Sequence, residues 1–266
     1  MLRAISSFVP ALVLAWGMAP VAMASDFDDG AANVKVSSDI GEFLAADSLF
    51  SPALAGWPNE TGQLKGKAVY VGRGCEADGI FFGPPDAYLA DPAGKVALID
   101  RGACRFTTKV ARAEAAGAIG AIVVNVPGDP AFGAGDWRIP MGPDFVPPAV
   151  GIPAVFVGFG DGSALAAAAP VNVNLLYKPF TLLKDALDKL PTLLSGKEKD
   201  DLKKLISRAA EIIEGDNPNY GEAALLAFQF QNEVISRFFE GKIELPAAQS
   251  LVDSSGHLGF RLSSLP

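Results

Sequence analysis

The fold of the first half of this chain is decided by Gly94–Asn125, GKVALIDRGACRFTTKVARAEAAGAIGAIVVN. Its apolar run Val96–Asp100 predicts a strand, and an apolar i, i+4, i+7 spacing that begins at Phe106 predicts a short amphipathic helix, with Gly117 as its C-terminal cap. Ala121–Asn125 predicts a second strand, apolar throughout as in a sheet covered on both faces. Strand, helix and strand in this order predict a right-handed crossover with parallel strands.

Turn residues separate further apolar runs on both sides of this segment. Strands are predicted at Lys67–Val71, Ile152–Val157 and Val171–Leu176, the last as a closing strand. Asp161 is positioned as the N-cap of a helix over Ala164–Ala169. These short elements indicate a first domain built mainly from strands.

The segment Pro127–Gly151 contains six prolines and five glycines in 25 residues. A loop of this length inside a compact domain is usually functional or mobile. We therefore expect a binding loop here, and its candidate contact residues are Trp137, Met141, Asp144 and Phe145.

The first 24 residues have the composition of a secretory signal peptide. Arg3 precedes an apolar run from Phe8 to Trp16, and Ala22-Met23-Ala24 offers a small-residue cleavage site before Ser25. An uncleaved membrane anchor is the alternative. We predict a secreted or periplasmic protein without a later membrane span, whose net charge changes from −8 to −9 when Arg3 is removed. This acidic balance argues against nucleic-acid binding.

Two cysteines, Cys75 and Cys104, remain after the predicted signal peptide. Export makes a disulfide between them chemically reasonable, and the alternative is two unpaired buried thiols. A bridge that closes a loop of this size would stabilise the fold by about 3–4 kcal/mol.

The composition changes near Tyr177–Lys178–Pro179, where Leu, Lys, Glu and Asp at helical spacing replace Gly, Pro and Val. Apolar stripes starting at Phe180, Leu202 and Ala223 predict antiparallel helices, and Pro246–Ser255 predicts a short fourth one. The predicted boundaries are a signal peptide at 1–24, a first domain at 25–178, a helical domain at 179–252 and a polar tail at 253–266.

The first domain resembles the protease-associated (PA) domain family over roughly Lys67–Leu176. The matching pieces are Gly94–Phe106, Lys109-Val110, Ala113–Ala118, Val123–Asn125, Met141-Gly142, Ile152–Val155 and Asp161-Gly162, in this order. Gly74-Cys75 together with Cys104 resembles the secreted bacterial members. The resemblance implies an α+β fold, with a small β-barrel or sandwich carrying short helices and preceded by an N-terminal extension. It also implies a lid, substrate-recognition or protein-binding role without catalytic residues.

The resemblance and the strand ends suggest where a ligand would bind. Arg101 follows a predicted strand and Arg105 lies close behind it, so both are candidate groove residues. The expected partner is a protein or peptide ligand, such as a secreted peptidase.

The residues of the chain provide no recognisable catalytic set. His257 is the sole histidine, no Gly-x-Ser-x-Gly sequence occurs, and a zinc site normally needs several such ligands. Glu76 and Asp78 are the best remaining carboxylates, but their neighbours do not complete a calcium loop. We therefore predict a non-enzymatic interaction module without metal or cofactor. The alternatives are an accessory subunit of a secreted peptidase, an unrecognised hydrolase, or a self-associating surface protein.

Overall fold

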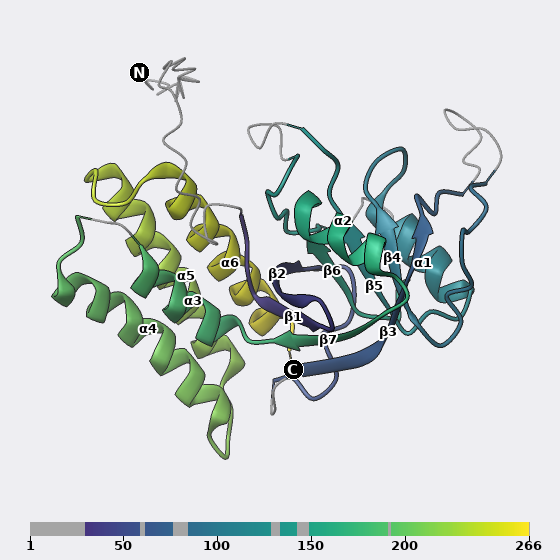
Figure 1. The fold of residues 1–266 in the computed structure, drawn as a ribbon. Coiled ribbons are helices and arrows are strands. Elements are labelled where there is room, and N and C mark those ends of the chain that lie inside the picture. Colours follow the sequence, from purple (N-terminus) through teal and green to yellow (C-terminus); the bar gives the residue numbers. More distant parts are fainter. Residues whose placement is uncertain are drawn as a thin grey trace, which may run out of the picture.

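A computed structural model describes residues 30–58, 62–76, 85–128, 134–142, 149–190 and 193–265 of the 266-residue chain. Within these residues a β-barrel stands beside a bundle of helices (Figure 1). The strands are β1 (Val34–Ser38), β2 (Gly41–Asp47), β3 (Gly62–Gly72), β4 (Val96–Asp100), β5 (Gly120–Val124), β6 (Ala154–Val157) and β7 (Val171–Tyr177). The helices are α1 (Phe106–Ala115), α2 (Phe159–Ala168), α3 (Pro179–Lys189), α4 (Gly196–Glu214), α5 (Tyr220–Phe239) and α6 (Leu245–Ser263). The predicted α+β fold, a barrel with short helices followed by a helical part, is confirmed.

The barrel closes in the order β1-β2-β6-β5-β4-β3-β7. Strands β3 to β6 pair in parallel, whereas β1, β2 and β7 pair antiparallel with their neighbours and complete the closure. The predicted crossover is β4–α1–β5. Every residue of β5 is buried because Ile122 and Val124 point into the barrel while Ala121 and Val123 pack in the cluster that also contains Val110 of α1.

Strands β1 and β2 were not predicted from the sequence. They form an antiparallel hairpin in which Val34 pairs with Ala45 and Val36 with Phe43. β2 reads Gly-Glu-Phe-Leu-Ala-Ala-Asp and contains no β-branched residue, so its local strand propensity is weak. Pairing with β1 and β6 in the closed barrel overrides that propensity.

Helix α2 begins earlier than the sequence indicates. Its N-cap is Gly158, and Asp161 lies within the first turn instead of capping the helix. A distant carboxylate takes over part of this role, since Asp136 Oδ1 accepts a hydrogen bond from the Gly160 backbone N–H at 2.6 Å. The predicted start was wrong because a cap supplied from another loop leaves no local sequence signal.

The polar tail predicted at 253–266 is also wrong, because α6 continues to Ser263. Its polar side chains recur at helical spacing and are buried: Ser250, Ser254, His257 and Arg261. The stripe faces the barrel instead of solvent. No helix among the described residues is long and apolar enough to span a bilayer.

These polar side chains join α6 to the start of the barrel. Ser254 Oγ accepts a hydrogen bond from the Ala32 N–H at 2.9 Å, and His257 Nδ1 lies 3.2 Å from Asn33 Nδ2. Farther along, Arg261 Nε donates to Asp47 Oδ2 at 2.7 Å. The helical bundle and the barrel are therefore packed together through a buried polar interface.

Candidate functional site

A groove of about 520 Å³ lies at the carboxyl ends of β3, β4 and β5, where α2 forms the opposite wall. Its lining residues are Tyr70, Arg73, Asp100, Arg101, Val124, Asn125, Val126, Pro127, Phe159, Ser163, Ala166 and Ala167. Parallel strands end at the same edge of a sheet, and ligands of such sheets commonly bind there. We call this cavity the strand-end groove.

One end of the strand-end groove is built by a tyrosine and an aspartate from neighbouring strands. The phenol of Tyr70 donates a hydrogen bond to Asp100 Oδ2 at 2.6 Å. This bond, together with partial burial, raises the pKa of Tyr70 to about 12. The tyrosine is therefore a neutral hydrogen-bonding group across the physiological pH range.

The groove also presents an arginine that is held in place by an asparagine. Arg101 donates to Asn125 Oδ1 at 2.8 Å, and burial lowers the pKa of its guanidinium. Asn125 in turn donates to the backbone carbonyl of Trp137 at 2.8 Å. This chain of contacts positions a cation over an apolar floor that includes Val124 and Phe159.

The structure places the predicted site residues in different environments. Arg101 lines the strand-end groove, whereas Arg105 is exposed at the N-cap of α1 and does not line it. Met141 is fully buried in the core beneath the barrel wall, so its assignment to a binding surface is corrected. Its carbonyl accepts the Leu49 N–H at 2.9 Å, which returns the loop to the barrel. Trp137 is half-buried.

Some predicted residues lie outside the described part of the chain. These are Asp144 and Phe145 of the candidate loop, Asp78 beside the cysteines, and the signal peptide. Glu76 is described and is exposed.

A disulfide anchors the segment beside the groove. Cys75 and Cys104 are bonded, with a Cα–Cα distance of 5.7 Å. Lys109 of α1 is buried beneath it, with Nζ 3.4 Å from Cys75 Sγ and donating to the carbonyl of Arg73. Burial lowers the pKa of Lys109 to about 8. Disulfide and lysine together hold the backbone from which Arg73 enters the groove.

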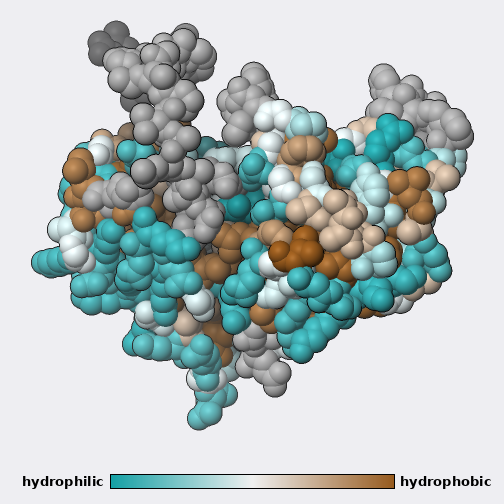
Figure 2. All heavy atoms as spheres, viewed as in Figure 1, coloured by the Kyte–Doolittle hydropathy of each residue, from teal (hydrophilic) through white to brown (hydrophobic). Residues whose placement is uncertain are grey.

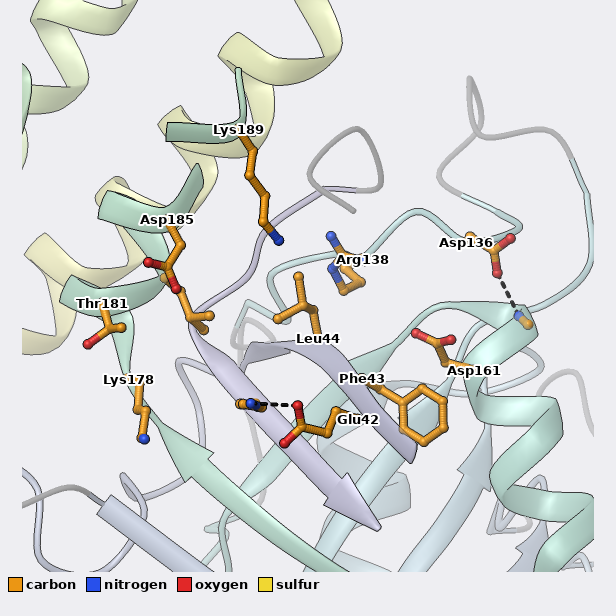
Figure 3. Close-up of a pocket in the computed structure, with 13 residues that line it drawn as sticks. Glu42, Phe43, Leu44, Asp136, Arg138, Asp161, Lys178, Thr181, Asp185 and Lys189 are labelled. Carbon is orange, nitrogen blue, oxygen red and sulfur yellow. Dashed lines mark hydrogen bonds and ion pairs between the residues drawn. The ribbon is translucent and has the colours of Figure 1, made fainter. Parts of the chain in front are cut away.

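A second cavity of about 500 Å³ lies between the barrel and α3 (Figure 3). In this interdomain pocket, Lys189 and Asp185 come from α3, and Arg138, Leu44 and Phe43 come from the barrel side. The pocket escaped sequence reasoning because its walls come from segments that are far apart in the chain. Charges of both signs line it, so it does not indicate one ligand class.

The chain matches the family model of the PA domain over residues 60–165. It is 32% identical over 135 residues to Aminopeptidase YwaD of Bacillus subtilis (strain 168), covering 51% of this chain and 26% of that protein. It is 58% identical over 43 residues to the PRADC1-like protein of Drosophila melanogaster, covering 16% of this chain and 22% of that protein. The chain therefore spans about a quarter of the length of these relatives.

Among solved structures, BSAP, a zinc aminopeptidase from Bacillus subtilis, aligns at 26% identity with a TM-score of 0.38, over 56% of this chain and 31% of that one. The aminopeptidase from Aneurinibacillus sp. strain AM-1 aligns at 25% identity with the same TM-score, also over 56% and 31%. Within the described ranges, no group of three or more His, Cys, Asp or Glu could hold a metal ion, so these residues do not fit a zinc site.

The matches with known proteins correct one prediction and establish another. The prediction of a non-enzyme is contradicted, because one of the matched relatives, YwaD, is an aminopeptidase and points to a peptidase-related role. A list of catalytic residue types could not reveal this relationship, because the similarity to YwaD lies in the order of residues along the chain. The ordered pieces around Gly94–Asn125 were interpreted correctly: this chain contains a PA domain at residues 60–165.

Proposed function

We propose that this chain acts in peptide hydrolysis and that the strand-end groove binds the polypeptide to be cleaved. The observation that carries the proposal is the position of this groove within the PA domain, in a chain whose curated relatives include an aminopeptidase. The relative supports the reaction class, and the groove supports the kind of ligand.

The chemistry of the groove suits an extended polypeptide. Its floor is apolar at Val124, Phe159 and Ala166, which matches peptide side chains. Arg101 and the Tyr70–Asp100 pair supply donors and acceptors for peptide carbonyl and N–H groups. A polypeptide needs both, because its backbone polar groups must stay hydrogen-bonded when they leave water.

We also propose that the chain is exported. The disulfide between Cys75 and Cys104 supports this location, since such bonds persist in oxidising compartments. The predicted signal peptide at residues 1–24 agrees with it. Mass spectrometry of the N-terminus of the native protein tests it, and an intact Met1–Ala24 would contradict cleavage.

Polypeptide binding is tested with fluorescein-labelled casein peptides and fluorescence anisotropy. Arg101→Ala is expected to weaken saturable binding by roughly tenfold or more, the value of one charge-assisted hydrogen bond. Arg105→Ala is the matched control, because it removes the same charge from an exposed position outside the groove and leaves binding unchanged.

Cleavage is measured in parallel by release of primary amines from the same peptides. Any turnover is expected to fall in Arg101→Ala at low peptide concentration and to recover at saturation, because the groove acts through binding. Absence of saturable binding, or equal loss in both variants, would refute the groove as the polypeptide site.

A further inference from the structure

Helix α5 has two apolar faces. The bundle buries one of them, and of the other only the partly buried Phe228 packs against the bundle core. Ala223, Ala227, Phe230 and Val234 are buried in the core of the helical part. On another face lies a row that we call the α5 stripe: Leu225, Phe228, Asn232, Ile235 and Phe239. Leu225 is 70% exposed, Ile235 36% and Phe239 81%.

The α5 stripe has the spacing of a helix-pairing surface. Its members are separated alternately by three and four residues, which is the heptad pattern of two helices packed along their length. Four of the five are large apolar residues, and Asn232 stands at the centre. A single polar asparagine in such a row fixes the register of the pair.

The row is symmetric about Asn232 to within one residue. Leu225 lies seven residues before it and Phe239 seven residues after it, while Phe228 and Ile235 lie four before and three after. An antiparallel second copy would therefore place Leu225 opposite Phe239 and Asn232 opposite itself, with Phe228 and Ile235 one residue out of register with each other. A two-fold interface requires this kind of self-complementary surface.

We propose that a second copy of this chain covers the α5 stripe, in an antiparallel two-fold pair centred on Asn232. Two copies of a chain with a net charge of −8 repel each other unless the residues at their contact are uncharged. Two residues that flank the stripe meet this condition. Gln229 and Ser236 are exposed and uncharged, and the two-fold places them opposite Ile235 and Phe228 of the other copy. No like charges meet at these positions.

The exposed area suffices for a dimer. Phe260 of α6 is 59% exposed and extends the stripe through its edge contact with Phe228, at 5.6 Å between ring centroids. With roughly 200 Å² for a phenylalanine side chain, Phe239, Phe260 and Leu225 together offer on the order of 400 Å² of apolar surface per copy. Standard interfaces bury about 800 Å² per partner, of which somewhat more than half is apolar. Hydrophobic surface is visible at the upper left of Figure 2, beside the turn that joins α5 to α6 in Figure 1.

Sedimentation velocity of the purified chain over a concentration series tests the proposal. We expect a concentration-dependent dimer whose dissociation constant rises at least roughly 30-fold in Phe239→Glu, as for a central interface residue. Leu89→Glu is the matched control, because Leu89 is also 70% exposed but lies in the connection between β3 and β4 of the barrel. It should leave the constant unchanged.

A cross-linking experiment tests the register. Both native cysteines are in the disulfide, so Asn232→Cys adds the sole free thiol. A short bis-maleimide is expected to join two Asn232→Cys chains and to leave Glu211→Cys, an exposed position on α4, uncoupled. A chain that is monomeric at all concentrations, a dimer equally weakened by Leu89→Glu, or coupling that does not distinguish the two cysteine variants would each overturn the proposal.

Discussion

Replacing Arg261 by methionine is expected to destabilise the fold by about 3–5 kcal/mol, the usual effect of removing one member of a buried ion pair. Arg261 and Asp47 are 8% and 2% exposed, and their Nε and Oδ2 atoms lie 2.7 Å apart. The guanidinium also donates to the carbonyls of Ser48 and Ser51. Methionine keeps much of the aliphatic stem, so most of the loss is electrostatic.

The sign of the pH dependence sharpens this prediction. Burial raises the pKa of Asp47, and the charge of Arg261 opposes that rise. In Arg261→Met the opposing charge is gone and only the backbone hydrogen bond at Ser48 still opposes burial, so the folded-state pKa of Asp47 lies above its unfolded value. When the pKa of a carboxyl group is higher in the folded than in the unfolded state, the fold becomes less stable as the pH rises above the unfolded-state pKa. The variant should therefore be destabilised more at pH 8 than at pH 5.

Urea unfolding followed by circular dichroism measures both effects. Lys204→Met is the control, because it makes a similar change in the exposed pair with Asp201, whose side chains are 75% and 50% exposed. Exposed pairs contribute at most about 1 kcal/mol, so the control should stay close to the wild type. The double variant Asp47→Ala/Arg261→Met should lose less than the sum of the two single variants. A loss below about 1 kcal/mol in Arg261→Met would refute the reasoning.

Burial lowers the pKa of His257 to about 3, from 6.5 for an unperturbed histidine. The stability that the neutral ring contributes to the fold above pH 6.5 is therefore lost as the pH falls towards 3. Between pH 7.5 and 5 the wild type should lose about 2 kcal/mol relative to His257→Gln, and parallel urea profiles would contradict this. Reducing the Cys75–Cys104 bond, which spans 29 residues, should cost about 3–4 kcal/mol, measured by urea unfolding with and without dithiothreitol. In Gly162→Ala the new Cβ would lie 2.2 Å from Val124 Cγ1. That overpacking should cost about 1–3 kcal/mol and lower the calorimetric Tm, whereas an unchanged Tm would show that α2 shifts freely.

Much of the barrel could be predicted because its sequence signals are local. Gly94–Asn125 became β4, α1 and β5 because short apolar runs and one helical spacing alternate within it. The hairpin of β1 and β2 escaped prediction, since β2 owes its strand conformation to its partners instead of its own residues.

The candidate site was only partly accessible from the sequence. Arg101 could be located because it follows directly after β4, at the edge where parallel strands end. Tyr70 and Phe159 could not be assigned to the same groove, because the barrel order that brings β3 and α2 to it is set by long-range pairing. Met141 was misplaced because only its burial distinguishes it from an exposed loop residue.

The sequence by itself determined the strand–helix–strand unit, the PA domain and the apolar stripes of the main helices, because each depends on neighbours within a few turns of chain. Only the tertiary structure decided the role of α6. Its polar stripe is typical of a solvated tail until Asp47, 214 residues before Arg261, is placed against it. Polar groups are stable in a protein interior when partners satisfy them, and no local pattern reveals partners so distant in sequence.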